Sequence, residues 1–213
     1  MSVVFYEPSN GHPFPRNPFK GCVVPRPIGW ISTISPDGVM NLAPYSFFNA
    51  IADSPPMVMF SSNGLHPHGR KDSADFAVAA GEFVVNIATY DLRDAMNASS
   101  EALPSDVDEF AVAGLTPAPS RLISAPRVAE APIHFECRLV KHLELPSPSD
   151  GRNVMVIGEV VGIHVNERVL TDGFVDIAKL KPIARLGYKD YAVVTEVFTM
   201  DRPAGGDALV GLA

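Results

Sequence analysis

Two long segments of the chain alternate between apolar and polar residues. In residues 133–144, one set of alternate positions holds Ile133, Phe135, Cys137 and Leu139, and the set between them holds His134, Glu136 and Arg138. This period of two predicts a half-buried β-strand. Residues 154–165 predict a second long strand, antiparallel to the first, with Gly158 and Gly162 as candidate β-bulges.

A β-hairpin is predicted nearer the N-terminus. The β-branched segments 28–34 and 39–42 flank Ser35-Pro36-Asp37-Gly38, which is typical of a turn because proline presets φ and glycine accepts a positive φ. Pro44 has no N–H to donate, so we expect residues 43–46 to leave the ladder as a loop. Residues 57–61 and the apolar run 82–89 predict two further strands, the second buried on both faces.

Helices are predicted to be short and peripheral. Residues 74–80 favour a helix that ends at Gly81, with Asp72 or Ser73 as its N-cap, and the polar, alanine-rich residues 92–101 suit a surface helix. A short strand is expected at residues 21–25. We therefore expect an all-β domain over residues 21–200, preceded by an extended arm (1–20) that lies over this domain or a neighbouring subunit, and followed by a flexible tail (201–213).

Composition excludes several classes of function. The net charge of −7, from 17 basic and 24 acidic residues, argues against nucleic-acid binding, which needs a basic surface. No apolar stretch approaches the length of a membrane span, and the N-terminus has no pattern of a secretory signal. Two unpaired cysteines, Cys22 and Cys137, fit a reducing compartment, so a cytoplasmic location is expected.

Lys71-Asp72-Ser73 is the sharpest chemical signal. The start of a helix presents unpaired N–H groups and a positive dipole end, where a phosphate can bind, with a hydroxyl from Ser73 and a charge from Lys71. A capped surface helix with an exposed lysine explains the same residues, and on spacing alone it is the commoner case.

Other polar residues also admit two interpretations. Arg26 lies between two prolines and could pair with a phosphate or make a structural salt bridge. His134 falls on the polar side of its strand, where it could approach a ligand or simply be exposed. His66 and His68 alone make no metal site, and without HExxH or a cysteine cluster we expect no metal.

Several sequence blocks occur in a characteristic order. They are RPIGWIST, NLAPYSFFNA, PPMVMFSS, KDS, EFVVNIAT, DEFAVAGLTP, FECRLV, VIGEVVGIHV and PIARLGYKDYA, spread over residues 18–195. Together they resemble the flavin reductase-like family of FMN-binding split β-barrel proteins. The resemblance implies a split barrel with peripheral helices, assembled as a homodimer with the FMN sites near the interface.

The resemblance also implies where FMN binds. Its 5′-phosphate is expected at Lys71, Asp72 and Ser73, with Ser61 and Ser62 as further donors and Arg26 as a candidate partner. The isoalloxazine ring is expected against Ser32, Thr33, Ala43, Pro44, Tyr45 and Ser46. His134, Arg185 and Tyr188 are candidate substrate contacts, and Tyr188 stands where the family pattern has a second glycine.

The implied activity is a flavin reduction. NADH or NADPH would pass a hydride to flavin N5, catalysed by alignment of the two rings and without a dedicated acid or base, and the reduced flavin would serve a monooxygenase or another redox partner. The alternative is an electron carrier like flavoredoxin, with tightly bound FMN and a protein partner. An oxidase of the pyridoxamine-phosphate type shares the barrel, but its basic phosphate-binding residues are not evident here.

Overall fold

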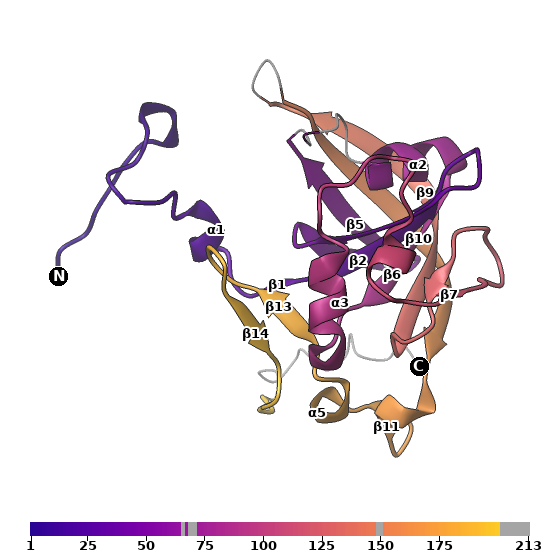
Figure 1. Ribbon diagram of the computed structural model, residues 1–213. Helices are drawn as coiled ribbons and strands as arrows, with labels where there is room; N and C mark the ends of the chain where they lie inside the picture. Colours follow the sequence, from indigo (N-terminus) through magenta and orange to yellow (C-terminus); the bar gives the residue numbers. More distant parts are fainter. Residues whose placement is uncertain (65–66, 68–71, 148–150, 201–213) are drawn as a thin grey trace.

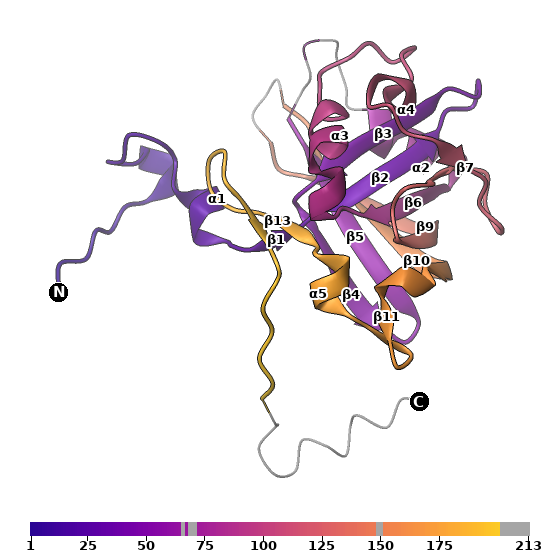
Figure 2. The ribbon, with the colours of Figure 1, turned by 60° about the horizontal axis from the view of Figure 1, so that its bottom comes forward.

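The computed structural model of the protein describes residues 1–64, 67, 72–147 and 151–200. The predicted tail, 201–213, lies outside the described residues, and so does Lys71. Figures 1 and 2 show a strand-rich body with short helices around it, and an N-terminal segment that extends away from this body beside α1.

Seven antiparallel strands in the described part of the chain form the main sheet, in the order β3-β2-β6-β9-β10-β5-β4. Their bounds are β2 (Gly29–Ile34), β3 (Met40–Tyr45), β4 (Phe48–Asp53), β5 (Pro56–Asn63), β6 (Glu82–Ile87), β9 (Ile133–Leu145) and β10 (Asn153–Val165). The two edge strands are consecutive in sequence, and the N–H of Ser61 in β5 donates to the carbonyl of Phe47 between them at 2.8 Å. The sheet therefore curls until its two edges lie near each other, while β3 keeps one unpaired edge, which confirms the predicted split β-barrel.

The barrel interior is filled by aromatic and branched side chains. Phe60 contacts Phe83 edge-on with ring centroids 5.2 Å apart, and the ring centroid of Tyr45 lies 5.1 Å from that of Phe60. Gly158 occupies one of two irregularities in the β9–β10 register, as predicted, and a Cβ at this position would lie 2.5 Å from the Phe83 ring. The bulge thus brings backbone against an aromatic ring where no side chain fits.

Short helices cover the barrel. The main ones are α2 (Asp72–Ala80), α3 (Arg93–Ala98) and α4 (Glu109–Val112). Helix α2 packs against β2 and β10 and ends before Gly81, whose φ is +72°, as the sequence predicts. Asp72 and Ser73, however, lie inside its first turn and are not its N-cap. Ala74 and Ala77 of α2 belong to the apolar cluster of the barrel interior, whereas a second cluster, with Trp30, Met96 and Phe110, packs α3 and α4 against the sheet.

Smaller elements complete the structure. A second sheet has the order β1-β13-β14, and other pairs and helical turns surround the barrel. Their bounds are β1 (Arg26–Pro27), β7 (Pro117–Ala118), β8 (Arg127–Val128), β11 (Leu170–Thr171), β12 (Phe174–Val175), β13 (Ile183–Arg185), β14 (Tyr191–Val193), α1 (Phe19–Cys22), α5 (Ile177–Leu180), η1 (Pro8–Asn10), η2 (Tyr90–Leu92) and η3 (Glu167–Val169).

Two local predictions are wrong, namely the end of the hairpin's second strand before Pro44 and the short strand at residues 21–25. Strand β3 does not end before Pro44 but continues to Tyr45, with Pro44 opposite Trp30. Because β3 is an edge strand, proline can occupy it with one side of the ladder free. Residues 19–22 form α1 instead of the expected strand at 21–25, and Gly21 of this helix packs closely against Gly187 of the turn after β13.

Within the described residues, no helix combines the length and apolar character needed to cross a membrane.

Candidate functional site

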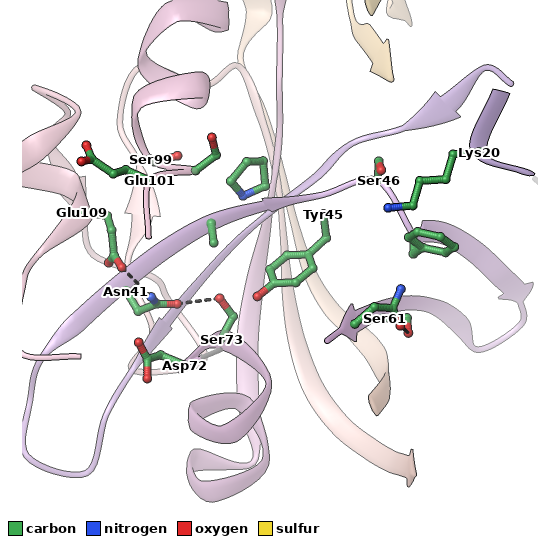
Figure 3. A pocket seen from close by; sticks show the side chains of 15 residues that line it. Lys20, Asn41, Tyr45, Ser46, Ser61, Asp72, Ser73, Ser99, Glu101 and Glu109 are labelled. Atoms are coloured by element: carbon green, nitrogen blue, oxygen red, sulfur yellow. Dashed lines mark hydrogen bonds between the residues drawn. The ribbon is translucent and has the colours of Figure 1, made fainter. Parts of the chain in front are cut away.

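A cavity of about 250 Å³ opens beside the free edge of β3 (Figure 3). It brings together seven of the residues predicted to bind a cofactor, which are Ala43, Pro44, Tyr45, Ser46, Ser61, Asp72 and Ser73. Successive side chains of a strand point to opposite faces. Since the consecutive residues 43–47 all line this cavity, it meets the edge of the strand, where backbone N–H and C=O groups are exposed.

A chain of hydrogen bonds forms one wall of this cavity. The amide nitrogen of Asn41 donates to Oε1 of Glu109 at 3.0 Å, and the hydroxyl of Ser73 donates to Oδ1 of Asn41 at 2.6 Å. Three polar side chains from β3, α2 and α4 are thus linked. Figure 3 shows Asn41, Ser73 and Tyr45 facing one another.

Burial shifts the two titratable groups of this wall. It raises the pKa of Glu109, although the N–H groups of Glu109 and Leu42 and the amide of Asn41 stabilise the carboxylate in part. The nearby Asp72 raises it further. Burial also raises the pKa of Tyr45, so this phenol is protonated and can donate.

A second cavity, of about 370 Å³, adjoins the first, and both are lined by Lys20, Pro44, Ser46 and Ser100. The second cavity adds Arg26, Arg185 and Tyr188 from the sequence prediction, together with Tyr191. Its charged lining residues are all basic, whereas the first cavity also contains the carboxylates of Asp72, Glu101 and Glu109. The two cavities form one depression with opposite charges at its ends.

Arg26 lines the second cavity, but its guanidinium is occupied by structural contacts. It donates to the carbonyls of Lys20 and Val23, the second at 2.6 Å, and to the carbonyl of Leu186 at 2.9 Å. Arg26 is also 7% exposed. The arginine therefore ties α1 to the turn after β13 through backbone carbonyls, and its contact with a phosphate stays a prediction.

Tyr188 holds an unusual backbone conformation at the mouth of the second cavity. Its φ is +56°, in the left-handed region, and Arg185 donates to its carbonyl at 2.5 Å. The guanidinium of Arg185 also stacks over the ring of Tyr191, 4.3 Å from its centroid. Residues other than glycine rarely adopt this φ. The fold therefore holds Tyr188 in a strained backbone conformation where the family pattern has glycine.

Four predicted residues lie outside both cavities. Ser32 is buried in β2, where its hydroxyl donates to the carbonyl of Pro126 at 2.5 Å, and Thr33 donates to Asn41 at 3.3 Å. Ser62 is buried behind the wall, against Tyr45. His134 is 4% exposed. The alternating pattern did not predict this burial, because neighbouring elements cover both faces of these strands.

His134 and Glu136 form a buried polar cluster instead of a solvent face. The Nε2 of His134 is 2.7 Å from the carbonyl of Val128, and its Nδ1 has no hydrogen-bond partner. Glu136 accepts from the N–H groups of Arg121 and Leu122 and lies 2.5 Å from Nε2 of His164. The half-buried strand predicted for 133–144 is present, but at its start both faces are covered.

Sequence reasoning missed other lining residues. Lys20 was assigned to the arm, and Glu109 stands 68 positions from Asn41, to which it is hydrogen-bonded. Asn41 and Phe47 lie within the block NLAPYSFFNA and could have been selected with their neighbours. Among the residues that the structure describes, no group of three or more His, Cys, Asp or Glu side chains is placed to hold a metal ion.

Residues 21–189 match the sequence model of the family described as "Flavin reductase like domain". A protein of Aquifex aeolicus is 41% identical over 172 residues, which covers 80% of this chain and 85% of that protein. The crystal structure of nitrilotriacetate monooxygenase component B from Bacillus cereus superimposes with a TM-score of 0.85 at 34% identity, covering 94% of this chain and all of that one. A 2-nitrobenzoate 2-nitroreductase from Pseudomonas fluorescens gives a TM-score of 0.77 at 28% identity, covering 88% and 89% of the two chains.

Proposed function

The chain belongs to the flavin reductase-like family, and we propose that it is an FMN-binding oxidoreductase that accepts a hydride from NADH or NADPH. The observation that carries this proposal is the pair of adjoining cavities beside the free edge of β3. The first cavity suits a flavin mononucleotide. The second, which has only basic charged lining residues, suits the phosphates of a nicotinamide nucleotide next to it.

The residues of the first cavity fit FMN by their chemistry. The exposed backbone of residues 43–47 offers donors and acceptors for the polar edge of an isoalloxazine ring. Lys20, whose Nζ lies 5.9 Å from the ring centroid of Phe47, offers a positive charge at the junction of the two cavities. A positive charge near a flavin favours its reduced anionic form. Because Lys20 lines both cavities, its charge would attract FMN in the first and the nicotinamide nucleotide in the second.

The phosphate of FMN would bind at the start of α2. The first turn of this nine-residue helix has N–H groups without intrahelical partners and a positive dipole end, with Asp72 and Ser73 in it and Lys71 before it. Ser61, in β5, faces the same cavity. The contribution of Ser73 is its backbone N–H, because its hydroxyl already donates to Asn41.

When bound, FMN would supply the redox chemistry by accepting the hydride at N5 from the reduced nicotinamide. The protein's own part is to bind and align the two rings. This alignment lowers the activation barrier of the hydride transfer by reducing its entropic cost. Ile28, Met96, Tyr188 and Tyr191 line the second cavity and would exclude water from it. No side chain of the two cavities has to act as acid or base.

We further propose a homodimer with a separate monooxygenase as acceptor of the reduced flavin. The N-terminal arm exposes large apolar side chains, with Val3 86% and Phe5 83% accessible, and it extends away from its own barrel (Figure 2). A second copy would cover it. The similarity to component B of a nitrilotriacetate monooxygenase supports such a redox partner.

An anaerobic visible spectrum tests the activity. The purified protein, loaded with FMN, is expected to lose its yellow absorbance within seconds of adding NADH or NADPH. Persistence of the colour with both nucleotides would identify an electron carrier reduced by a protein. A protein that cannot be loaded with FMN would contradict both functions.

A matched pair of variants tests the site. Lys20→Met should weaken FMN retention roughly tenfold, since it removes a cation from the junction of the cavities. Lys141→Met removes an exposed lysine of β9 outside both cavities and should leave retention unchanged. Equal retention by the two variants would place FMN elsewhere.

A further inference from the structure

The hydrogen bonds along the wall of the first cavity run in one direction. Both oxygens of the Glu109 carboxylate accept, from the amide nitrogen of Asn41 at 3.0 Å and from the N–H of Leu42 at 3.1 Å. A carboxylate can only accept, so the nitrogen of the Asn41 amide must face Glu109. Its oxygen must then face the hydroxyl of Ser73, 2.6 Å away.

This orientation determines the hydroxyl of Ser73. A serine hydroxyl has one proton, and that of Ser73 goes to the oxygen of Asn41. While Glu109 is ionised, the hydroxyl of Ser73 therefore offers only lone pairs to a ligand.

Negative charges around the wall also disfavour an anionic ligand beside Ser73. Asp72 on α2 faces Glu109, and Glu101, which precedes α4, lines the same cavity. On the β3 side Glu109 meets only the neutral donors of Asn41 and Leu42, and Lys20 lies on the far side of Tyr45 (Figure 3). An anion at the Ser73 end would therefore meet carboxylates and lone pairs.

We propose that Glu109 takes up one proton from solvent when an anionic phosphate binds beside Ser73, and that this proton reverses the hydrogen bonds of the wall. The neutral carboxyl group can donate to the oxygen of Asn41 once that amide has turned over. The amide nitrogen then donates to Ser73, whose own proton becomes free for the phosphate. Each group keeps its normal valence, and the wall changes from acceptor to donor.

The inference deepens the proposed function, on which it rests for the identity of the phosphate as that of FMN. Burial and the neighbouring Asp72 already raise the pKa of Glu109. An anion close by raises it further, because it disfavours a second negative charge. Glu109 is a positioning residue here, since it acts on the ligand through Asn41 and Ser73.

Calorimetry in two buffers of different ionisation enthalpy measures the proton. At a pH above the pKa of Glu109, wild-type protein should take up close to one more proton per FMN than Glu109→Gln. As the pH rises, the FMN affinity of wild-type protein should therefore fall by up to tenfold more per pH unit than that of the variant. Riboflavin, which lacks the phosphate, serves as the control ligand and should show no difference between the two proteins. Equal proton uptake and equal pH dependence with FMN would overturn the proposal.

Two further measurements test the role of Glu109 independently of the proposed function. An infrared difference spectrum of wild-type protein should gain a band of a protonated carboxyl group on adding FMN, and its absence would overturn the proposal even if Glu109→Gln does not fold. If FMN does not bind, the proposed function fails, and inorganic phosphate becomes the probe. Phosphate binding with proton uptake would still support the role of Glu109, whereas folded protein that binds neither ligand would overturn it.

Discussion

Gly187 and Gly21 touch backbone to backbone, so that a Cβ added to Gly187 would lie 2.9 Å from the Cα of Gly21. This contact joins α1 to the turn after β13, and Arg26 reinforces it by binding carbonyls of both segments. The two segments carry Lys20, Arg185 and Tyr188, which line the second cavity. The width of that cavity therefore depends on a close approach of two glycines.

Gly187→Ala should destabilise this contact. The new methyl group would meet backbone, which cannot move as a flexible side chain can, and we expect a loss of about 1–3 kcal/mol in the free energy of unfolding. Gly21→Ala is the matched control, because its Cβ would lie 3.8 Å from the same neighbour, an ordinary contact. Urea unfolding of both variants checks this, and equal stabilities would contradict the close packing.

Tyr188→Gly should be more stable than Tyr188→Ala by about 1 kcal/mol, because glycine adopts the φ of +56° without strain. Both variants lose the ring, so the comparison isolates the backbone. Thermal or urea unfolding measures the difference. If the alanine variant is the more stable, the turn does not hold its left-handed conformation in solution.

Protonation of His134 should destabilise the protein at acid pH. Burial lowers its pKa from 6.5 to about 4, so below pH 6.5 the unfolded chain binds a proton that the folded chain does not. Stability should fall by about 3 kcal/mol between pH 6.5 and 4 through this group. In His134→Gln this part of the pH dependence should vanish. Unfolding titrations of both proteins at several pH values measure it, and a pH dependence that persists in the variant would show that another group causes it.

Glu136 should stabilise the fold at neutral pH. Burial alone would raise its pKa, but the N–H of Arg121, the side chain of His164 and the N–H of Leu122 together lower it below 4.5. A lowered pKa means that its contribution is present above pH 4.5 and is lost as the pH falls through the lower folded value. We expect Glu136→Gln to cost about 1–3 kcal/mol at pH 7.

The same substitution should cost much less once the wild-type carboxylate is protonated. Unfolding free energies of wild-type protein and Glu136→Gln, measured from pH 7 downward until the protein unfolds, test this convergence. A difference that stays constant with pH would show that the carboxylate charge is not what holds residues 121 and 122.

Periodicity, turn residues and blocks of neighbouring residues were enough to predict the strands of the main sheet other than β4, the hairpin turn at Gly38, the helix ending at Gly81 and the family. The other features depend on contacts between residues that are distant in the sequence. Pro44 stays in a strand because β3 is at an edge of the sheet. Arg26 donates to backbone carbonyls, one of which belongs to Leu186, 160 positions away. Asn41, Ser73 and Glu109 meet only because the barrel closes, and the direction of their hydrogen bonds follows from which groups are buried together, a property that no local pattern encodes.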